Sequence, residues 1–348
     1  MKIKINNQFY NFFDNITINY KLDSVASLFS FDARFNPNNA AHRLIFQPLT
    51  YNKVEIFDNN DNLKFTGTSI NTSLGSNSKR DLQNISGYSK GGILEDCTIP
   101  YSAYPLENLN VSLKDISTRL LKEFGLNFII DSSVMNEMNQ TYPKAVAGPE
   151  ETIKEFISKL AAQRNIILSH DAKGNIVFFK PNANAKAKIY FSAENTTSMN
   201  LSVNGQSMHS TISVIRQPSK DNPSLTPVDT INNHLLKTNR TVVKVLSSGS
   251  ETDTQKAANN ALADELKSIV VDIEINRYED LNCGDIVEVH NHEIFLFHKI
   301  RLMISEIVIT ETVSEQKMSL KLMLPETFTG DEPKNIFYDF QHNQRKHH

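Results

Sequence analysis

Hydrophobic and polar residues alternate along the first hundred positions, a period-two pattern typical of half-buried β-strands. Val54 and Ile56, for example, alternate with Lys53 and Glu55. Two runs typical of turns follow: "DNNDN" at 58–62 ends this strand, and "GSNSKR" at 75–80 separates the next two strands. The pattern therefore predicts a meander of antiparallel strands over residues 1–101.

Residues 102–181 combine helical and strand patterns. In "SLKDISTRLLKEFG", Ser112 stands at a helix N-cap, apolar residues recur on one helical face, and Gly125 ends the pattern. "GPEETIKEFISKLAAQRN" predicts a second helix, with Pro149 at its start and glutamates in its first turn. "NIILSHDAKGNIVFFKP" then predicts a β-hairpin. We expect a small α+β module here.

Strand patterns return in residues 182–220 and 281–328. Between them, residues 221–280 contain one predicted helix, "TDTQKAANNALADELKSIV". In the closing segment the apolar positions change from even at Ile304 to odd at Ile307. One extra residue between them predicts a β-bulge near Ser305-Glu306.

The two β regions share an order of features. "KVEIFDNNDNLKFTGTSI" and "DIVEVHNHEIFLFHKIRLMISEI" each contain a short alternating strand with a central acidic residue, a loop, and a longer strand. The match predicts two related modules, in which Val54 and Ile56 correspond to Val287 and Val289. The predicted division of the chain is a first β module at 1–101, an α+β module at 102–181, a second β module at 182–220 and 281–328, an inserted α+β module at 221–280, and a C-terminal arm at 329–348; the family resemblance given below implies that each β module is a β-barrel.

Length and composition bound the function. The chain has 348 residues, of which 39% are hydrophobic, so packed domains are expected. Its net charge of −3 argues against a dedicated nucleic-acid binder, which usually contains a strongly basic domain. Its two cysteines, Cys97 and Cys283, are too few for a disulfide framework, which favours synthesis in a reducing cytoplasm. We see no signal-peptide pattern and no apolar run of membrane-spanning length, so no membrane association is expected.

Cys97 follows Asp96 near the end of a Gly-rich stretch, "SKGGILEDCTIP", and this position raises the question of nucleophilic catalysis. A nucleophilic cysteine needs a nearby base, and adjacent carboxylates such as Glu95 and Asp96 raise a thiol pKa. No local signature supplies the base. We therefore expect a strand that ends at Tyr88, a turn, and a short return strand, with Cys97 buried and Asp96 acting as a turn or cap acceptor. The stretch also lacks the Lys-Ser/Thr pair of a phosphate-binding loop.

Three histidines raise the question of a metal site, because His290 and His292 share a strand face and His298 could come from the paired strand. No carboxylate or cysteine motif completes the set at a defined spacing, so we expect them at a strand–loop edge without a metal. The glutamates of the second predicted helix fit the helix dipole better than the carboxylate pair of a glycoside hydrolase. We expect no cofactor, no catalytic residues and no enzymatic activity.

Three segments carry a family resemblance. "ISGYSKGGILEDCTIP", which contains Gly87, Asp96 and Cys97, resembles the end of the first barrel in the baseplate hub proteins of Mu-like contractile phage tails. "GPEETIKEFISKLAAQRNIILSHDAKGNIVFF" resembles the second domain of that family. The segment that begins "LNCGDIVEVHNHEIF", with Gly284 and Asp285, and ends "LMLPETF" looks like the closing segment of the second barrel.

The resemblance implies a mainly β fold with α+β insertions, in which two related β-barrel modules and two small α/β modules form a ring-shaped trimer. The implied role is a structural hub that adapts the six-fold tail tube to the three-fold central spike and lines the exit channel for DNA or effectors. Its location would be the virion baseplate, after assembly in the host cytoplasm. The implied partners are two further copies of the chain, the central spike protein, the tail tube or tube-initiator protein, the baseplate wedge proteins and the tape-measure protein, with no specific nucleic-acid binding.

Two alternatives stay open at this point: a tail-tip cell-wall hydrolase, and the hub of a type VI-like contractile injection particle. The C-terminal arm adds an interaction hypothesis, because no predicted element buries its apolar residues, which are Ile336, Phe337, Tyr338 and Phe340. Exposed apolar clusters commonly mark contacts, so we expect the arm to lie against an adjacent hub subunit or another baseplate protein.

Overall fold

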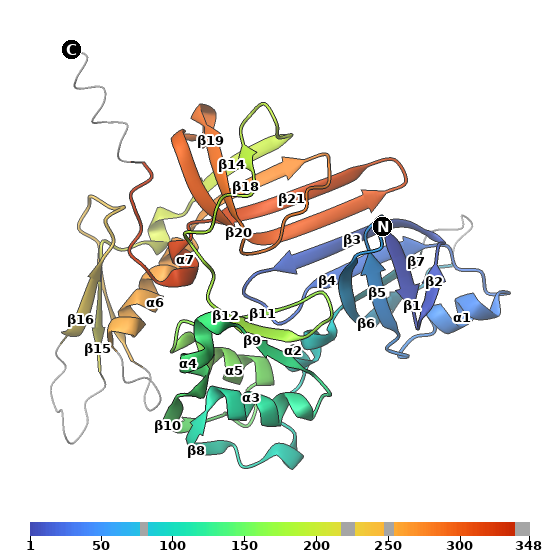
Figure 1. The fold of residues 1–348 in the computed structure, drawn as a ribbon, viewed down its shortest axis with the longest axis horizontal. Helices are drawn as coiled ribbons and strands as arrows, with labels where there is room; N and C mark the ends of the chain where they lie inside the picture. Colours follow the sequence, from blue (N-terminus) through green and yellow to red (C-terminus); the bar gives the residue numbers. More distant parts are fainter. Residues whose placement is uncertain (77–82, 217–226, 247–253, 338–348) are drawn as a thin grey trace.

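A computed structural model of the chain describes residues 1–76, 83–216, 227–246 and 254–337 (Figure 1). A long β-sheet occupies the top and right of this view, a helical module lies below it, and a smaller sheet with one helix lies at the left. In the described part of the chain, no helix combines the length and the apolar character needed to cross a membrane.

In the described part of the chain the long sheet has 13 strands, and it joins the two β regions of the sequence because β3 pairs with β20. Its path is β14-β18-β21-β20-β3-β4-β7-β6-β5-β1-β2, and β19 pairs with both β20 and β13. The strands of its first half are β1 (Lys2–Ile5), β2 (Gln8–Tyr10), β3 (Phe13–Lys21), β4 (Leu28–Ala33), β5 (Lys53–Phe57), β6 (Leu63–Ser73) and β7 (Gln83–Ser89). The strands of its second half are β13 (Tyr190–Phe191), β14 (Ser198–Val203), β18 (Ile269–Ile275), β19 (Ile286–Asn291), β20 (Leu296–Thr312) and β21 (Gln316–Met323).

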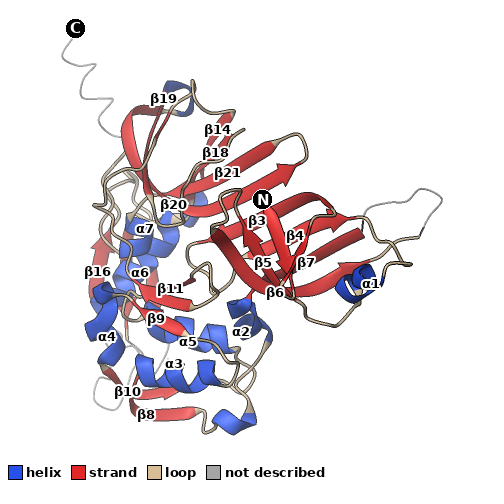
Figure 2. Cartoon of the chain, turned by 45° about the vertical axis from the view of Figure 1, so that its right-hand side comes forward, coloured by secondary structure: helices blue, strands red, loops and turns tan. Residues whose placement is uncertain are grey.

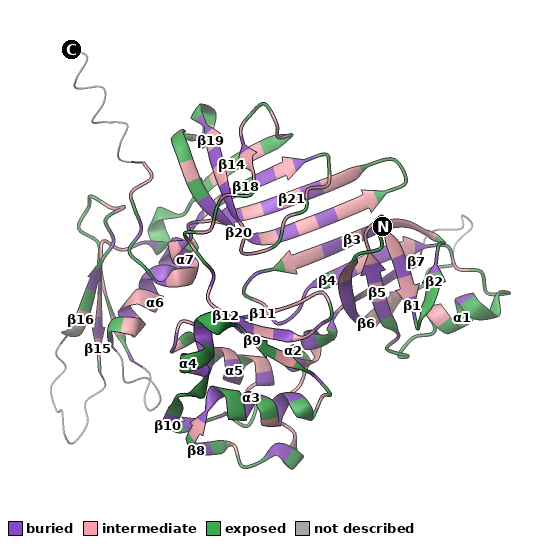
Figure 3. Cartoon of the chain, viewed as in Figure 1, coloured by how far each residue is buried: buried purple, intermediate pink, exposed green. Residues whose placement is uncertain are grey.

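Period-two burial explains why these segments form strands. Buried and half-buried residues alternate along β21 and along the last part of β20, from Ser305 to Thr310, as Figure 3 shows by colour. The register between these strands shifts between Ile304 and Glu306, which keeps Ile304 and Ile307 both on the buried face. The predicted β-bulge at Ser305 is therefore confirmed.

The two halves of the sheet repeat the same strand order. β3-β4-β7-β6-β5 in the first half corresponds to β14-β18-β21-β20-β19 in the second. The registers also correspond, because Val54 pairs with Gly67 where Val287 pairs with Leu302. Three residues beyond Gly67 and Leu302, both long strands carry a register shift, at Ile70 and at Ser305. The predicted match of Val54 and Ile56 with Val287 and Val289 agrees with this pairing.

The expected barrels are not closed, which corrects that prediction. None of the sheets formed by the described residues returns to its own first strand. Among the residues that the structure describes, β14 pairs only with β18 and the two-residue β13 only with β19, so each has one edge without a described partner. Closure would require a hydrogen-bonded partner on each of these edges.

The helical module below the long sheet contains two small sheets packed on helices (Figure 2). Ser112 caps α3 by accepting from the Asp115 N–H, as expected, whereas the second helix begins after Pro149 with a capping box between Thr152 and Glu155. Its elements are β8 (Glu107–Ser112), α3 (Leu113–Lys122), β9 (Phe128–Ile130), α4 (Met135–Asn139), β10 (Thr141–Val146), α5 (Ile153–Ala162), β11 (Ile167–His170) and β12 (Ile176–Phe179).

The smaller sheet is formed by β15 (Thr211–Ile215), β16 (Pro227–Asn232) and β17 (Thr241–Val245), and α6 (Thr254–Leu266) packs against it. β15 thus pairs outside the long sheet, although the sequence pattern grouped it with the second β region. The predicted helix ends at Leu266, and Ile269 begins β18 of the long sheet instead. The division into domains stays a prediction. β15 pairs with β16 and β17 and packs against α6, whereas β18 pairs within the long sheet. The remaining helices are α1 (Ala40–Phe46), α2 (Ile93–Asp96) and α7 (Glu326–Thr329).

Candidate functional site

The Gly-rich stretch after β7 packs tightly against its surroundings. It continues into a 3-10 turn, Lys90–Gly92, and one turn of α2. A Cβ at Gly91 would overlap the Val25 carbonyl oxygen, and one at Gly92 would overlap the Tyr88 ring. The glycines therefore permit close approach of backbone and ring. The expected return strand is wrong, because a helical turn stands there, followed only by an isolated bridge between Thr98 and Thr152.

Cys97 follows the last residue of α2 and is half-exposed, which corrects the prediction that it is buried. Its position at the end of the turn leaves the side chain at the rim of the helical module's core. The Asp96 carboxylate accepts a hydrogen bond of 2.7 Å from the Tyr88 hydroxyl. Burial, and then this bond, raise the pKa of Tyr88. Asp96 thus acts as an acceptor that positions Tyr88.

Gly87, Gly284 and Asp285 have structural roles. A Cβ at Gly87 would overlap the Thr68 carbonyl of the paired strand and contact the Phe29 ring at 2.9 Å. Gly284 has a φ of +93°, which favours glycine, and it precedes β19. The Asp285 carboxylate accepts from the Asn282 N–H at 2.9 Å and so closes the turn before that strand.

The three histidines lie at one end of β19 and β20. The rings of His290 and His292 meet edge to face with centroids 4.5 Å apart, and His292 stacks on Phe297. His298 is exposed on β20. Within the described residues no group of three His, Cys, Asp or Glu side chains converges on a possible metal position.

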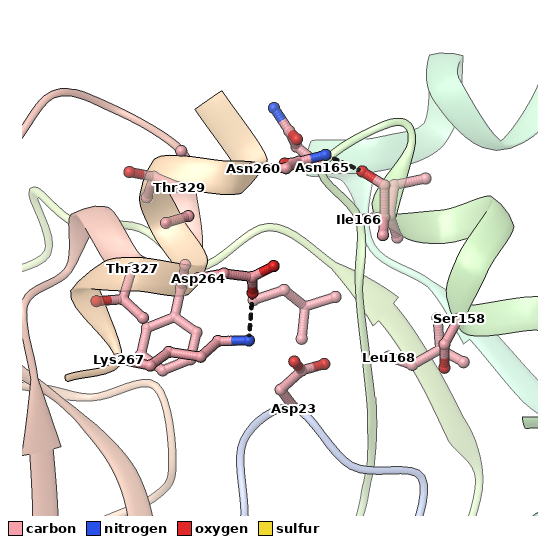
Figure 4. A pocket seen from close by; sticks show the side chains of 15 residues that line it. Asp23, Ser158, Asn165, Ile166, Leu168, Asn260, Asp264, Lys267, Thr327 and Thr329 are labelled. Atoms are coloured by element: carbon pink, nitrogen blue, oxygen red, sulfur yellow. Dashed lines mark hydrogen bonds and ion pairs between the residues drawn. The ribbon is translucent and has the colours of Figure 1, made fainter. Parts of the chain in front are cut away.

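A pocket of about 200 Å³ lies where α5, α6, α7 and the loop after β3 meet (Figure 4). Lys267 points into it and forms an ion pair of 2.9 Å with Asp264, while Asp23 approaches from the β3 side. Burial acts to lower the pKa of Lys267, but the bond with Asp264 and the charges of Asp264 and Asp23 raise it above its ordinary value. A nucleophilic lysine needs the opposite shift. The Asn260 amide donates to the Ala162 carbonyl at 2.9 Å, so the pocket wall links α6 to α5.

A second cavity of about 340 Å³ lies beside the β3–β20 junction. Its wall includes His170, whose ring nitrogens lie 3.0 Å from the Ser24 carbonyl and 2.7 Å from the Ser27 hydroxyl. Burial lowers the pKa of His170. Burial, and then the Glu306 charge, raise the pKa of Cys283 to about 12, so this thiol stays protonated near neutral pH.

Hydrogen bonds connect polar side chains across one face of the long sheet. The Asn19 amide donates to Glu306 at 2.7 Å across the junction of the halves, and Lys321 lies 3.2 Å from the same carboxylate. The face continues in both directions through further bonded pairs, which are Asn15–Asp32, Asn84–Asp32, Thr17–Thr310 and Lys317–Glu274. Partial burial acts to raise the pKa of Glu306, but the bonds from Asn19 and Lys321 hold it below its ordinary value.

Sequence reasoning missed this polar face because its bonds join strands far apart in the chain. The only available signal was the polar residue at every second position of each strand. We call this set of residues the polar sheet face.

The beginning of the C-terminal arm contacts its own chain. Ile336 and Phe337 pack against the core of the second half, and the Phe337 ring lies 6.2 Å from that of Phe295. This corrects the expectation that no element of the chain covers these two residues. Tyr338 and Phe340 lie outside the described residues.

Comparisons with known proteins agree with the resemblance stated above. Residues 91–180 match the family described as baseplate hub protein gp44-like, second domain. The fold is similar to that of the 43 kDa tail protein of prophage MuSo2 from Shewanella oneidensis, with a TM-score of 0.79 and 16% identity over 94% of this chain and 99% of that one. A tail protein from Neisseria meningitidis MC58 gives a TM-score of 0.76 and 15% identity over 95% and 98%. No curated protein sequence matches the chain.

A component of the E. coli type VI secretion system is also similar, with a TM-score of 0.59 and 9% identity over 97% of this chain and 80% of that one. Its description notes structural similarity to the T4 bacteriophage tail proteins gp27 and gp5. The fold is thus that of phage tail and related injection-system proteins. The resemblance to baseplate hub proteins is confirmed, since residues 91–180 match a domain of that family.

Proposed function

We propose that the chain is a structural hub subunit of a phage or phage-like tail baseplate, and that three copies form a ring. The observation that carries the proposal is the repeat within the long sheet. Each chain contains two halves with the same strand order and register, joined head to tail by β3 and β20. Three such chains would give six similar modules around a true three-fold axis.

That symmetry suits an adaptor between a six-fold tail tube and a three-fold central spike. On one side the ring would contact the tube or its initiator protein, and on the other the spike; wedge and tape-measure proteins are the further partners that we propose. The particle would assemble in the host cytoplasm and remain in the virion baseplate.

The polar sheet face suits the wall of the exit channel. Its side chains are already paired with one another, as in the Asn19–Glu306 and Lys317–Glu274 contacts. A wall whose lysines are paired with carboxylates, as in the Lys321–Glu306 and Lys317–Glu274 contacts, offers passing DNA no basic track for strong binding. DNA would therefore pass without specific recognition.

A structural role also fits the candidate catalytic residues. Asp96 holds Tyr88, the Cys283 thiol is protonated, and Lys267 is paired with Asp264. We accordingly propose no enzymatic activity and no cofactor. The hub of a type VI-like injection particle is the second candidate, favoured by the similarity to the E. coli secretion component over 97% of this chain.

The test is the native mass of the purified full-length chain, combined with an assay for cell-wall hydrolysis. The proposal expects a particle of about three times 39.4 kDa without hydrolytic activity. A monomer that degrades cell walls would contradict the proposal and favour the tail-tip hydrolase.

A further inference from the structure

Two strand edges of the long sheet have no partner among the described residues. β6 pairs with β5 only up to Ser69–Asn52, so its last part, from Asn71 to Ser73, is paired on the β7 side alone. At the far end of the sheet, β14 pairs with β18 alone. In Figure 1, β14 lies in the upper part of the molecule and β6 on the right.

The internal repeat gives each free edge a counterpart that is occupied. β6 corresponds to β20, and β14 corresponds to β3. Within the chain, the last part of β20 pairs antiparallel with β3, with Val308 opposite Asn19 and Ile309 opposite Ile18. The free edges are thus the two partners of a second junction of the same kind, which one chain cannot form by itself.

The registers fix which residues correspond. On the long strands, Ser73 of β6 corresponds to Val308 of β20, and Leu74, just after β6, corresponds to Ile309. On the other edge, Ser202 and Leu201 of β14 correspond to Asn19 and Ile18 of β3, respectively. By the same correspondence Val203 occupies the position of Tyr20, which lies opposite Ile307.

Exposure of apolar side chains supports a missing partner at these positions. Leu74 is 46% exposed and Val203 is 49% exposed. At the occupied junction, Ile309, the counterpart of Leu74, is 5% exposed, whereas Tyr20, the counterpart of Val203, is half-buried. An apolar residue that is exposed where its counterpart is covered indicates a surface that becomes buried on assembly.

Neither edge carries the usual protection against pairing. Natural edge strands are commonly guarded by Lys, Pro or inward charges. The sequence from Asn71 to Leu74 is Asn-Thr-Ser-Leu, and β14 is Ser-Met-Asn-Leu-Ser-Val, neither of which has a proline or a charge.

We infer that the last part of β6 pairs antiparallel with β14 of a second copy of this chain, with Ser73 opposite Ser202 and Leu74 opposite Leu201. The pairing extends the long sheet from one subunit into the next by strand addition. It joins two different edges, so it runs head to tail and closes only as a ring. The inference rests on the proposed trimer and names the contact that would hold it together.

The test is a disulfide between Ser73→Cys and Ser202→Cys in one chain that also carries Cys97→Ala. Directly opposed cross-strand residues lie within disulfide range. Within one chain these positions are seven strand spacings apart, on the order of 30 Å along the sheet, so a bond between them reports a contact between copies. The matched control is Asn19→Cys with Val308→Cys, the equivalent pair at the junction inside the chain, which should close within a monomer.

After mild oxidation we expect covalent trimers on a denaturing gel for the double variant, and monomers for each single variant. A native trimer that fails to cross-link, while the control pair does close, would overturn the inferred pairing and leave the proposed trimer standing. A native monomer that does not cross-link would contradict both. A cross-linked ladder that extends beyond three copies would support the strand pairing and contradict the closed trimer.

Discussion

The side-chain amide of Asn19 on β3 donates a hydrogen bond of 2.7 Å to the carboxylate of Glu306 on β20, across the line where the two halves of the chain meet. The same carboxylate accepts from Lys321. Replacing Glu306 with Ala removes both bonds and leaves the Asn19 amide without its acceptor. We expect the free energy of unfolding to fall by about 1–3 kcal/mol, measured by urea denaturation. An unchanged unfolding midpoint would contradict a role for this contact in joining the halves.

The same carboxylate gives the junction a pH dependence. The pKa of Glu306 in the folded chain is below its ordinary value of 4.5. A lowered folded pKa means that the ionised group stabilises the fold above the unfolded pKa, and that this stabilisation disappears as the pH falls through 4.5 and then through the folded pKa. Between pH 6 and pH 3, Glu306→Gln should therefore lose less stability than the unchanged chain. A parallel loss in both proteins would argue against this assignment.

The sequence was sufficient for features that depend on local pattern. The bulge at Ser305, the cap at Ser112 and the correspondence of Val54 with Val287 all follow from alternation, spacing or short motifs. It was not sufficient where the partner of a strand lies far away in the chain. Ile269 continues a helical pattern but lies in β18, where it pairs with Val203 of β14.

The candidate site was harder to predict for the same reason. The polar sheet face depends on cross-strand partners such as Asn19 and Glu306, which are far apart in the chain. Cys97 was placed in a core because free cysteine is commonly buried, but the single turn of α2 leaves it at a rim.

Gly87 should tolerate no side chain. A Cβ there would overlap the Thr68 carbonyl in the paired strand β6, which is backbone and cannot rotate away. We expect Gly87→Ala to lower the free energy of unfolding by about 1–3 kcal/mol, as overpacking in a fixed interior does. Gly75→Ala is the control, because nothing lies within 4 Å of the Cβ it would add. Equal unfolding midpoints for the two variants would show that the strands can separate to accommodate the methyl group.

The two cysteines should differ in reactivity. Both side chains are half-buried, but burial, and then the Glu306 charge, raise the pKa of Cys283 to about 12. At pH 8 only about one Cys283 thiol in 10⁴ would be ionised, and the thiolate is the reactive form. A colorimetric thiol reagent should therefore label one cysteine quickly in the native chain, and that fast phase should disappear in Cys97→Ala. A fast phase that survives in this variant would place the reactive thiol at Cys283.

The start of the C-terminal arm should contribute to the stability of the subunit. Phe337 is half-buried against the core of the second half and near Phe295. Phe337→Ala should lower the free energy of unfolding by about 1–2 kcal/mol, since part of its apolar surface is already covered. If the variant unfolds at the same urea concentration but assembles poorly, the residue serves a partner instead, as the sequence alone suggested.

Leu74 offers the sharpest separation between folding and assembly. The side chain is 46% exposed in the isolated chain, while its counterpart Ile309 is 5% exposed at the junction with β3. A charge at Leu74 would be hydrated in the monomer but buried without a partner against Leu201 of the next copy. Leu74→Glu should thus leave the melting temperature of the monomer unchanged and weaken trimer formation at least tenfold, measured by native mass across a dilution series. Val313→Glu is the matched control, because Val313 is an apolar residue 89% exposed at the end of the β20–β21 hairpin, outside the inferred contact. Equal loss of the trimer in both variants would mean that added negative charge alone opposes assembly, and would remove the support that Leu74 gives to the inferred contact.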